Sequence, residues 1–179
     1  MKGAENRTEL YTGGAAEKSH PVIFFRGKLD SLCALIVETQ FIAEEEGRAP
    51  CAGDLQEVLE YIRSIFASEY TGNPLQEAKL AGLSFDEIRE RSHHPQKFYS
   101  LGHLQMHHSM GRLCIKLNLL RTAIREAELA AVAAFKGERG DIIQAMNRLS
   151  SLAYILIYKY LPEGYQPGPG GAFQSVAKS

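Results

Sequence analysis

The stretch from Arg112 to Phe135, RLCIKLNLLRTAIREAELAAVAAF, decides the fold of this 179-residue chain. It contains no Gly and no Pro, and its apolar residues recur every three or four positions, which predicts one long amphipathic helix. The apolar stripe of this helix consists of Leu113, Leu117, Leu120, Ile124, Ala127 and Ala131. Because other elements must cover such a stripe, the helix is expected to lie inside a bundle.

Three charged residues lie on the flank of this stripe. At about 100° per residue, Arg121, Arg125 and Glu128 fall within roughly 60° of one another. Charged groups beside a core face need partners of opposite charge. Two interpretations are open: an ion-pair set within the helix, or a pair of guanidiniums that binds an anion.

Further helical patterns run from about 27 to 46, from 54 to 68 and from 141 to 160, with Asp54 and Asp141 as expected caps. A short helix opens at the capping box Ser84–Glu87 and is closed by Pro95. The apolar run at residues 22–25 has no partner strand nearby and is interpreted as the lead-in to the first helix. The chain is therefore expected to be all-α, a five-helix bundle with ferritin-like up-down packing.

The length predicts one domain with an extension at each end. Residues 1–20 form an arm, residues 21–162 the helical bundle, and residues 163–179 a tail too rich in Pro and Gly to fold alone, which is expected to be mobile. Within the arm, Thr12-Gly13-Gly14 followed by Lys18 has two interpretations: a phosphate-binding loop or a plain flexible segment.

Charge and cysteine usage exclude several functions. With 20 basic and 21 acidic side chains the net charge is −1, so nonspecific binding to nucleic acid or an anionic membrane is not expected, and any phosphate site must be local. No apolar run is long enough to span a bilayer and the N-terminus has no apolar signal core, so a cytoplasmic protein is expected. The three cysteines form no C-x-x-C pair, which argues against a zinc ribbon or an iron–sulfur cluster.

Five of the six histidines fall between His93 and His108, just before the long helix. A metal site is one interpretation, but a di-iron bundle needs two Glu-x-x-His motifs and only Glu90–His93 is evident. A polar loop and a ligand-facing loop are the other two interpretations, and all three stay open.

Four motifs in order resemble the ATP:cob(I)alamin adenosyltransferases, over about residues 12 to 162. They are residues 24–32 (FFRGKLDSL), residues 92–103 with Ser-His-His-Pro and Leu-Gly-His, residues 118–128 (NLLRTAIREAE), and residues 147–150 (NRLS). The second and third are most similar to the ethanolamine-utilisation branch. Some members of that branch carry an N-terminal His and Cys metal motif, which this chain lacks, so a requirement for that metal is not expected here.

The resemblance implies transfer of the 5′-deoxyadenosyl group of ATP to cob(I)alamin, in the service of ethanolamine degradation. Lys18, Arg121 and Arg125 would hold the triphosphate together with Mg²⁺, and Lys18 lies twelve residues before Asp30, as the family pattern requires. By the same resemblance Asp30 would pair with Arg121, and Glu128 would orient the arginines. The remaining residues expected to bind ATP or cobalamin are Thr12, Gly13, Arg26, Asn147 and Phe98.

The family further implies a homotrimer with active sites between subunits and a corrinoid-facing loop around Phe98. It also implies a corrinoid reductase and an adenosylcobalamin-dependent lyase as partners, with a bacterial microcompartment as a location. Two other functions stay open: a non-catalytic bundle that stores or delivers corrinoid, and a ferritin-like metal protein.

Overall fold

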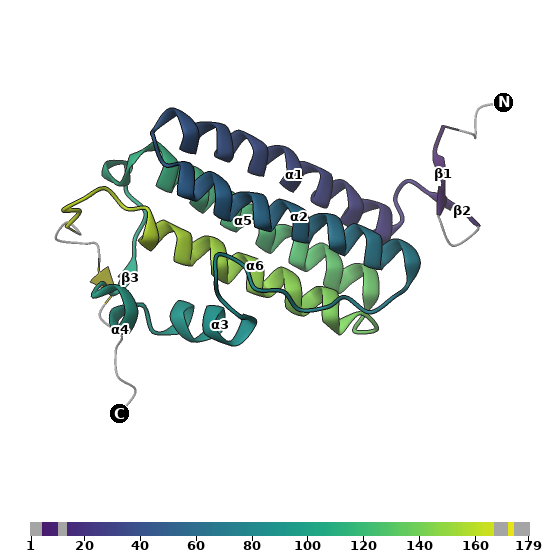
Figure 1. Ribbon diagram of the computed structural model, residues 1–179. Helices are drawn as coiled ribbons and strands as arrows, with labels where there is room; N and C mark the ends of the chain where they lie inside the picture. The colour runs from purple at the N-terminus through teal and green to yellow at the C-terminus, as the bar shows by residue number, and fades with distance from the viewer. Residues whose placement is uncertain (1–4, 11–13, 167–171, 174–179) are drawn as a thin grey trace.

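Four long helices run side by side and form the body of the protein (Figure 1). The computed structural model describes residues 5–10, 14–166 and 172–173. The long helices are α1 (Pro21–Glu45), α2 (Ala49–Thr71), α5 (Gly111–Phe135) and α6 (Gly140–Lys159). Between α2 and α5 the chain forms α3 (Phe85–His93), which packs on α6, then α4 (Pro95–Tyr99) and the 3₁₀ turn η1 (His108–Met110).

The helical class is confirmed, but the expected five helices are not. The described residues contain six α-helices and two small antiparallel sheets, β1 (Arg7–Leu10) with β2 (Gly14–Glu17) and β3 (His103–Leu104) with β4 (Ala172–Phe173). Pro95 does end the preceding helix, which stops at His93, but it also opens α4, because proline suits the first turn of a helix.

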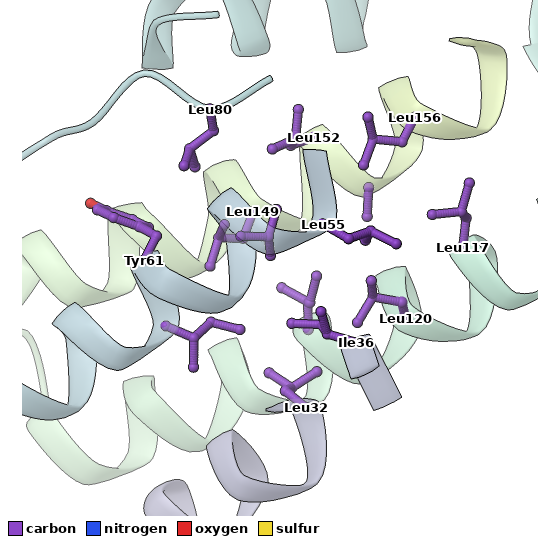
Figure 2. Close-up of a cluster of buried hydrophobic side chains, with 14 of the residues drawn as sticks. Leu32, Ile36, Leu55, Tyr61, Leu80, Leu117, Leu120, Leu149, Leu152 and Leu156 are labelled. Carbon is purple, nitrogen blue, oxygen red and sulfur yellow. The ribbon is translucent and has the colours of Figure 1, made fainter. Parts of the chain in front are cut away.

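The core lies where the inner faces of α1, α2, α5 and α6 meet (Figure 2). All six residues of the stripe predicted on α5 are buried. They meet Leu32 and Ile36 of α1, Leu55 of α2 and Leu149 of α6. Each fully buried leucine or isoleucine contributes about 1.5–3 kcal/mol by leaving water, so this stripe fixes how the bundle packs.

Two helices begin earlier than expected because proline and the local turn decide the start. α1 begins at Pro21, where the ring of His20 accepts a hydrogen bond from the backbone N–H of Val22 (3.3 Å). α2 begins at Ala49 with Pro50 in its first turn, so Asp54 lies inside the helix and is not its cap. Asp54 instead accepts hydrogen bonds from Lys159 Nζ and the Tyr160 hydroxyl, both at 2.7 Å.

Asp141 is also not a cap, since α6 begins at Gly140 after Arg139. Its carboxylate accepts from Arg139 Nε (3.0 Å) and from the backbone N–H of Leu75 (2.8 Å). The hydrogen bonds from Arg139, chiefly, lower the pKa of Asp141 to about 2. Arg139 also donates to the carbonyl of Ser68 (3.1 Å), so this cluster ties the end of α2 and its connector to the start of α6.

Short strands are present in the described parts of the arm and of the tail. Strands β1 and β2 form a hairpin at the start of α1, and the backbone N–H of Lys18 donates to the carbonyl of Asn6 (2.8 Å). In the tail, Ala172 and Phe173 pair with Leu104 and His103, so this part of the tail lies against the loop before α5. None of the described helices has the length and apolar character needed to cross a bilayer.

Candidate functional site

A hollow of about 460 Å³ opens between α5, α6 and the segment that precedes α5. Residues that line it include Asn118, Arg121 and Arg125 from α5, Asn147, Ser150, Ser151 and Tyr154 from α6, and Ser92, His93, His103, Leu104 and Met106 from the segment before α5. We call this the arginine hollow.

Helical spacing explains why these side chains meet. On α5 the polar residues of the hollow are three and four positions apart, at 118, 121 and 125, and therefore share one face. On α6, Asn147, Ser151 and Tyr154 follow the same spacing. The apolar stripes of both helices point into the core, so their polar flanks are brought edge to edge.

The arginine hollow is electropositive. It has two guanidiniums, and none of its described lining residues is a carboxylate. Arg125 is exposed, and no acidic group of the described residues lies within 4.0 Å of it. Ion pairing within the helix is therefore not what holds these arginines, and the arrangement suits a multiply charged anion.

Glu128 is engaged with Asn147 instead. The side-chain amide of Asn147 donates to Glu128 Oε1 at 3.0 Å, and its oxygen accepts from Arg148 Nη1 at 2.8 Å. These two contacts fix which end of the Asn147 amide is the donor. Glu128 thus orients Asn147, and its expected role in orienting the arginines stays a prediction.

Arg121 rests against two neighbours within the hollow. Its Nη1 donates to Asn118 Oδ1 (3.3 Å), and its Cζ lies 5.4 Å from the centre of the Tyr154 ring. Tyr154 was not singled out from the sequence, although its position seven residues after Asn147 places the two on one face of the last helix.

The expected pair of Asp30 and Arg121 does not form within one chain. Lys28 of α1 faces α5, where its Nζ lies 2.8 Å from Glu126 Oε2. Asp30 is two residues further and so about 200° round the helix, on the side toward α2. Arg121 lies on the opposite flank of α5, toward α6, so the α1–α5 pair separates the two charges.

Asp30 belongs to a second hollow of about 640 Å³ between α1 and α2. Its lining includes Arg26, Arg63, Phe66, Glu69 and Tyr70. Arg26 donates to both carboxylate oxygens of Glu69, at 2.7 and 2.9 Å, and their side chains are only 14% and 9% exposed. We call this second hollow, between α1 and α2, the acidic–basic hollow. The structure therefore places Arg26 and Asp30 together, apart from Arg121 and Arg125.

Two other predicted residues, Lys18 and Phe98, are not among the residues that line the two hollows. Lys18 is exposed just before α1, whereas Thr12 and Gly13 lie outside the described residues. Phe98 is partly buried, with Arg91 Cζ at 5.3 Å and Lys97 Nζ at 4.9 Å from its ring centre. Two cations therefore lie close to this ring, in the part of the chain before α5.

The histidine-rich segment divides in two. His93 and His103 line the arginine hollow, whereas the rings of His107 and His108 lie against each other, with centres 4.0 Å apart. In the part of the chain that the structure describes, no three His, Cys, Asp or Glu side chains gather as a metal site would require.

A family model described as cobalamin adenosyltransferase matches residues 1–160, which is most of the chain. The chain belongs to the cobalamin adenosyltransferase family. Among curated members it is 34% identical over 162 residues to the corrinoid adenosyltransferase EutT of Salmonella typhimurium, and 34% identical over 161 residues to EutT of Escherichia coli K12. These alignments cover 88% and 87% of this chain but 59% of each relative, so the chain spans about three fifths of their length.

The fold is shared with solved members of the cobalamin adenosyltransferase family. Two variants of the PduO-type ATP:corrinoid adenosyltransferase from Lactobacillus reuteri, each complexed with cobalamin and ATP, superpose with TM-scores of 0.66 and 0.67 at 16% identity. The matches cover 89% and 92% of this chain and 91% and 96% of those proteins. At this identity the likeness establishes the bundle alone.

Proposed function

We propose that this protein transfers the 5′-deoxyadenosyl group of ATP to cob(I)alamin, forming adenosylcobalamin for ethanolamine degradation. The observation that carries the proposal is the arginine hollow, in which Arg121 and Arg125 face a space without a lining carboxylate among the described residues. A triphosphate is the part of ATP that such a site would recognise.

The chemistry asks the protein for orientation and not for a nucleophile. Cobalt(I) of the corrinoid substrate supplies both electrons of the new bond to the 5′ carbon and becomes cobalt(III). The bond from that carbon to the triphosphate oxygen breaks, and its electron pair leaves with triphosphate. What this chain must do is align the two substrates and stabilise the charge that builds on the leaving group.

The residues of the arginine hollow fit that task. Arg125 is exposed toward the space and Arg121 is held by Asn118 and Tyr154, so one guanidinium is adaptable and the other is fixed. Asn147, held by Glu128, would contact the nucleoside. Mg²⁺ would be held mainly by the triphosphate oxygens, since the described lining offers amide and hydroxyl oxygens but no carboxylate.

The corrinoid would lie over the segment before α5. Leu104 and Met106 supply apolar surface at the rim of the arginine hollow, and Phe98 is close by in sequence. We further propose that a corrinoid reductase supplies the cob(I)alamin and that an adenosylcobalamin-dependent lyase receives the product.

We also propose that the active site is completed between subunits of a homotrimer. Arg26 and Asp30 lie on the α1–α2 side and Lys18 precedes α1, so a neighbouring chain would have to bring them to the arginine hollow. The outward faces of α1 and α5 carry most of the large exposed apolar residues in the described chain. These are Phe24, Val37, Phe41, Ile115, Leu119, Leu129 and Val132, which we call the α1/α5 apolar surface. Large exposed apolar residues on two neighbouring helices favour a protein contact there.

An anaerobic assay with chemically reduced cobalamin, ATP and Mg²⁺ tests the function. Formation of the cobalt–carbon bond changes the corrinoid absorption spectrum, and triphosphate should appear in equal amount. If corrinoid binds but ATP does not, the protein is a corrinoid carrier. If neither substrate binds, the proposed function is wrong.

A further inference from the structure

Tyr154 touches both sides of the arginine hollow. Its ring lies beside the Arg121 guanidinium, 5.4 Å from Cζ to ring centre. Its hydroxyl points the other way, toward the segment before α5, where it accepts a hydrogen bond from the backbone N–H of Leu104 (3.2 Å). One side chain therefore contacts the proposed triphosphate arginine and the proposed corrinoid-facing segment.

The hydroxyl of Tyr154 belongs to a continuous chain of hydrogen bonds. It lies 2.6 Å from the hydroxyl of Tyr158, one helical turn further along α6. The Tyr158 hydroxyl in turn donates to the carbonyl of Gly102 at 2.9 Å and lies within reach of Leu104 N–H at 3.3 Å. Nδ1 of His103 lies 3.2 Å from the Tyr154 hydroxyl.

Counting hydrogens gives this chain a direction. A carbonyl can only accept, so the single hydrogen of the Tyr158 hydroxyl goes to Gly102. The 2.6 Å bond between the two tyrosines must then use the hydrogen of Tyr154. The Tyr154 oxygen has none left for His103, so the remaining contact requires a hydrogen on Nδ1 of His103.

The chain is anchored in a packed environment. Tyr158 is buried, and its ring stacks on that of Tyr99 with centres 4.9 Å apart and planes 21° apart. Burial raises the pKa of Tyr158, so the hydroxyl stays a donor at every physiological pH. A protected network of this kind is rigid, because each broken bond would leave a polar group unpaired.

We propose that Tyr154 is a positioning residue that holds Arg121 and segment 102–104 at a fixed distance from each other. It does so through a chain of hydrogen bonds that fixes the proton of His103 on Nδ1. Its role would be to keep the triphosphate side and the corrinoid side of the site at a constant separation. The role of Tyr154 in positioning the two substrates rests on the proposed function, whereas the direction of the hydrogen-bond chain does not.

The direction is tested by nitrogen-15 NMR of the histidine side chains in the full protein. We expect His103 to carry its hydrogen on Nδ1 in the neutral ring. In Tyr158→Phe the Tyr154 hydroxyl loses its acceptor and turns to Nδ1, so His103 should change to the Nε2–H tautomer. Tyr160→Phe is the matched control, because its hydroxyl binds Asp54 outside the hollow and the tautomer should not change. An Nε2–H ring in the unaltered protein would overturn the proposal.

The positioning role is tested by two substitutions with different consequences. Tyr154→Phe keeps the ring beside Arg121 but removes the hydroxyl, so corrinoid affinity should fall about tenfold while ATP affinity changes less than about twofold. Exchange of the Leu104 amide hydrogen should accelerate by a similar factor, about tenfold. Tyr154→Leu also removes the ring, and ATP affinity should then fall about two- to fivefold. Equal losses for both ligands in Tyr154→Phe would show that Tyr154 is merely structural.

The readouts separate this proposal from the proposed function. If the protein binds neither ATP nor corrinoid, the adenosyltransferase proposal has failed, yet the His103 tautomer and Leu104 exchange still test the hydrogen-bond chain. If Tyr154→Leu fails to fold, as circular dichroism would show, Tyr154→Phe and Tyr158→Phe decide the matter because each removes one oxygen atom.

Discussion

Asn147 and Glu128 join α6 to α5 beside the arginine hollow, through a hydrogen bond of 3.0 Å from the amide to the carboxylate. The bond has a consequence for charge as well as for shape. It holds the carboxylate of Glu128 away from the guanidinium of Arg125, which would otherwise be its partner three residues earlier on the same helix. Arg125 is thereby left available to an anionic ligand.

This relationship predicts coupling between the two residues. Asn147→Ala should weaken ATP binding about fivefold, because Glu128 is released to neutralise Arg125. Glu128→Gln keeps an acceptor for Asn147 and should be milder than Glu128→Ala. A double-mutant cycle on ATP affinity, with Gln144→Ala on the same helix as control, should show non-additivity. Additive losses would mean that the hydrogen bond has no role in ligand binding.

Arg125 itself should be needed for turnover. Arg125→Ala removes a positive charge from the position where charge shifts to the leaving triphosphate, and the rate should fall about 10²- to 10³-fold. Helix content measured by circular dichroism should not change, since the side chain is exposed. Arg125→Lys should recover part of the rate, and Arg89→Ala on α3 should behave as the unaltered protein. A folded Arg125→Ala protein with near-normal kinetics would remove this residue from the site.

The interior of the fold could be predicted from the sequence more completely than the site. The stripe from Leu113 to Ala131 determines which face of α5 is buried, and periodicity alone reveals it. The flank that carries Arg121 and Arg125 follows from the same geometry. Tyr154 could not be recognised, because an aromatic residue on an apolar helix looks like core until its hydroxyl partners are known.

The errors have local physical causes. Helix starts at Pro21 and Ala49 were missed because apolar and acidic residues suggested later boundaries, whereas proline favours the first turn. The resemblance implies that Asp30 pairs with Arg121, whereas within one chain the two residues lie on outer flanks of the α1–α5 pair. Periodicity shows which way a side chain points on its own helix, but not which neighbour lies on that side.

Asp141 should make stability depend on acid pH. Its pKa is lowered to about 2, mainly by hydrogen bonds from Arg139, whereas an aspartate in the unfolded chain titrates near 4. The carboxylate therefore stabilises the fold fully above about pH 4 and loses that contribution as pH falls toward 2. Asp141→Asn should lower the free energy of unfolding at pH 7 by about 1–2 kcal/mol, after allowance for screening of a partly exposed pair.

Urea unfolding at pH 7, 4, 3 and 2 measures this effect. The curves for the unaltered protein and Asp141→Asn should converge toward pH 2, and Arg139→Ala should flatten the profile in the same way. A constant difference at all pH values would assign the loss to packing and not to the charge of Asp141.

The α1/α5 apolar surface should hold the subunits together. Leu129 is 70% exposed and Phe41 is 61% exposed, which is costly for residues of this size unless a partner covers them. Leu129→Glu should therefore shift the protein to a smaller species in analytical ultracentrifugation and lower its activity. The same charge introduced at an exposed site of α6, Gln144→Glu, should change neither. An unaltered oligomer in Leu129→Glu would place the subunit contact elsewhere.

A site shared between subunits predicts complementation of two inactive variants. Asp30→Ala damages the acidic–basic hollow and Arg121→Ala damages the arginine hollow, and these hollows lie on different sides of one chain. In randomly mixed trimers about a quarter of the subunit boundaries would join one intact hollow of each kind, so about a quarter of the activity should return.

The variants should be mixed after mild dissociation, with differently sized tags so that native mass spectrometry can count mixed trimers. Lys18→Ala should replace Asp30→Ala in the mixture with the same result, because both come from the front of the chain. Mixed trimers with no more activity than the separate variants would show that each chain builds its site alone. An active protein that is monomeric at assay concentration would contradict the shared site without the mixing experiment.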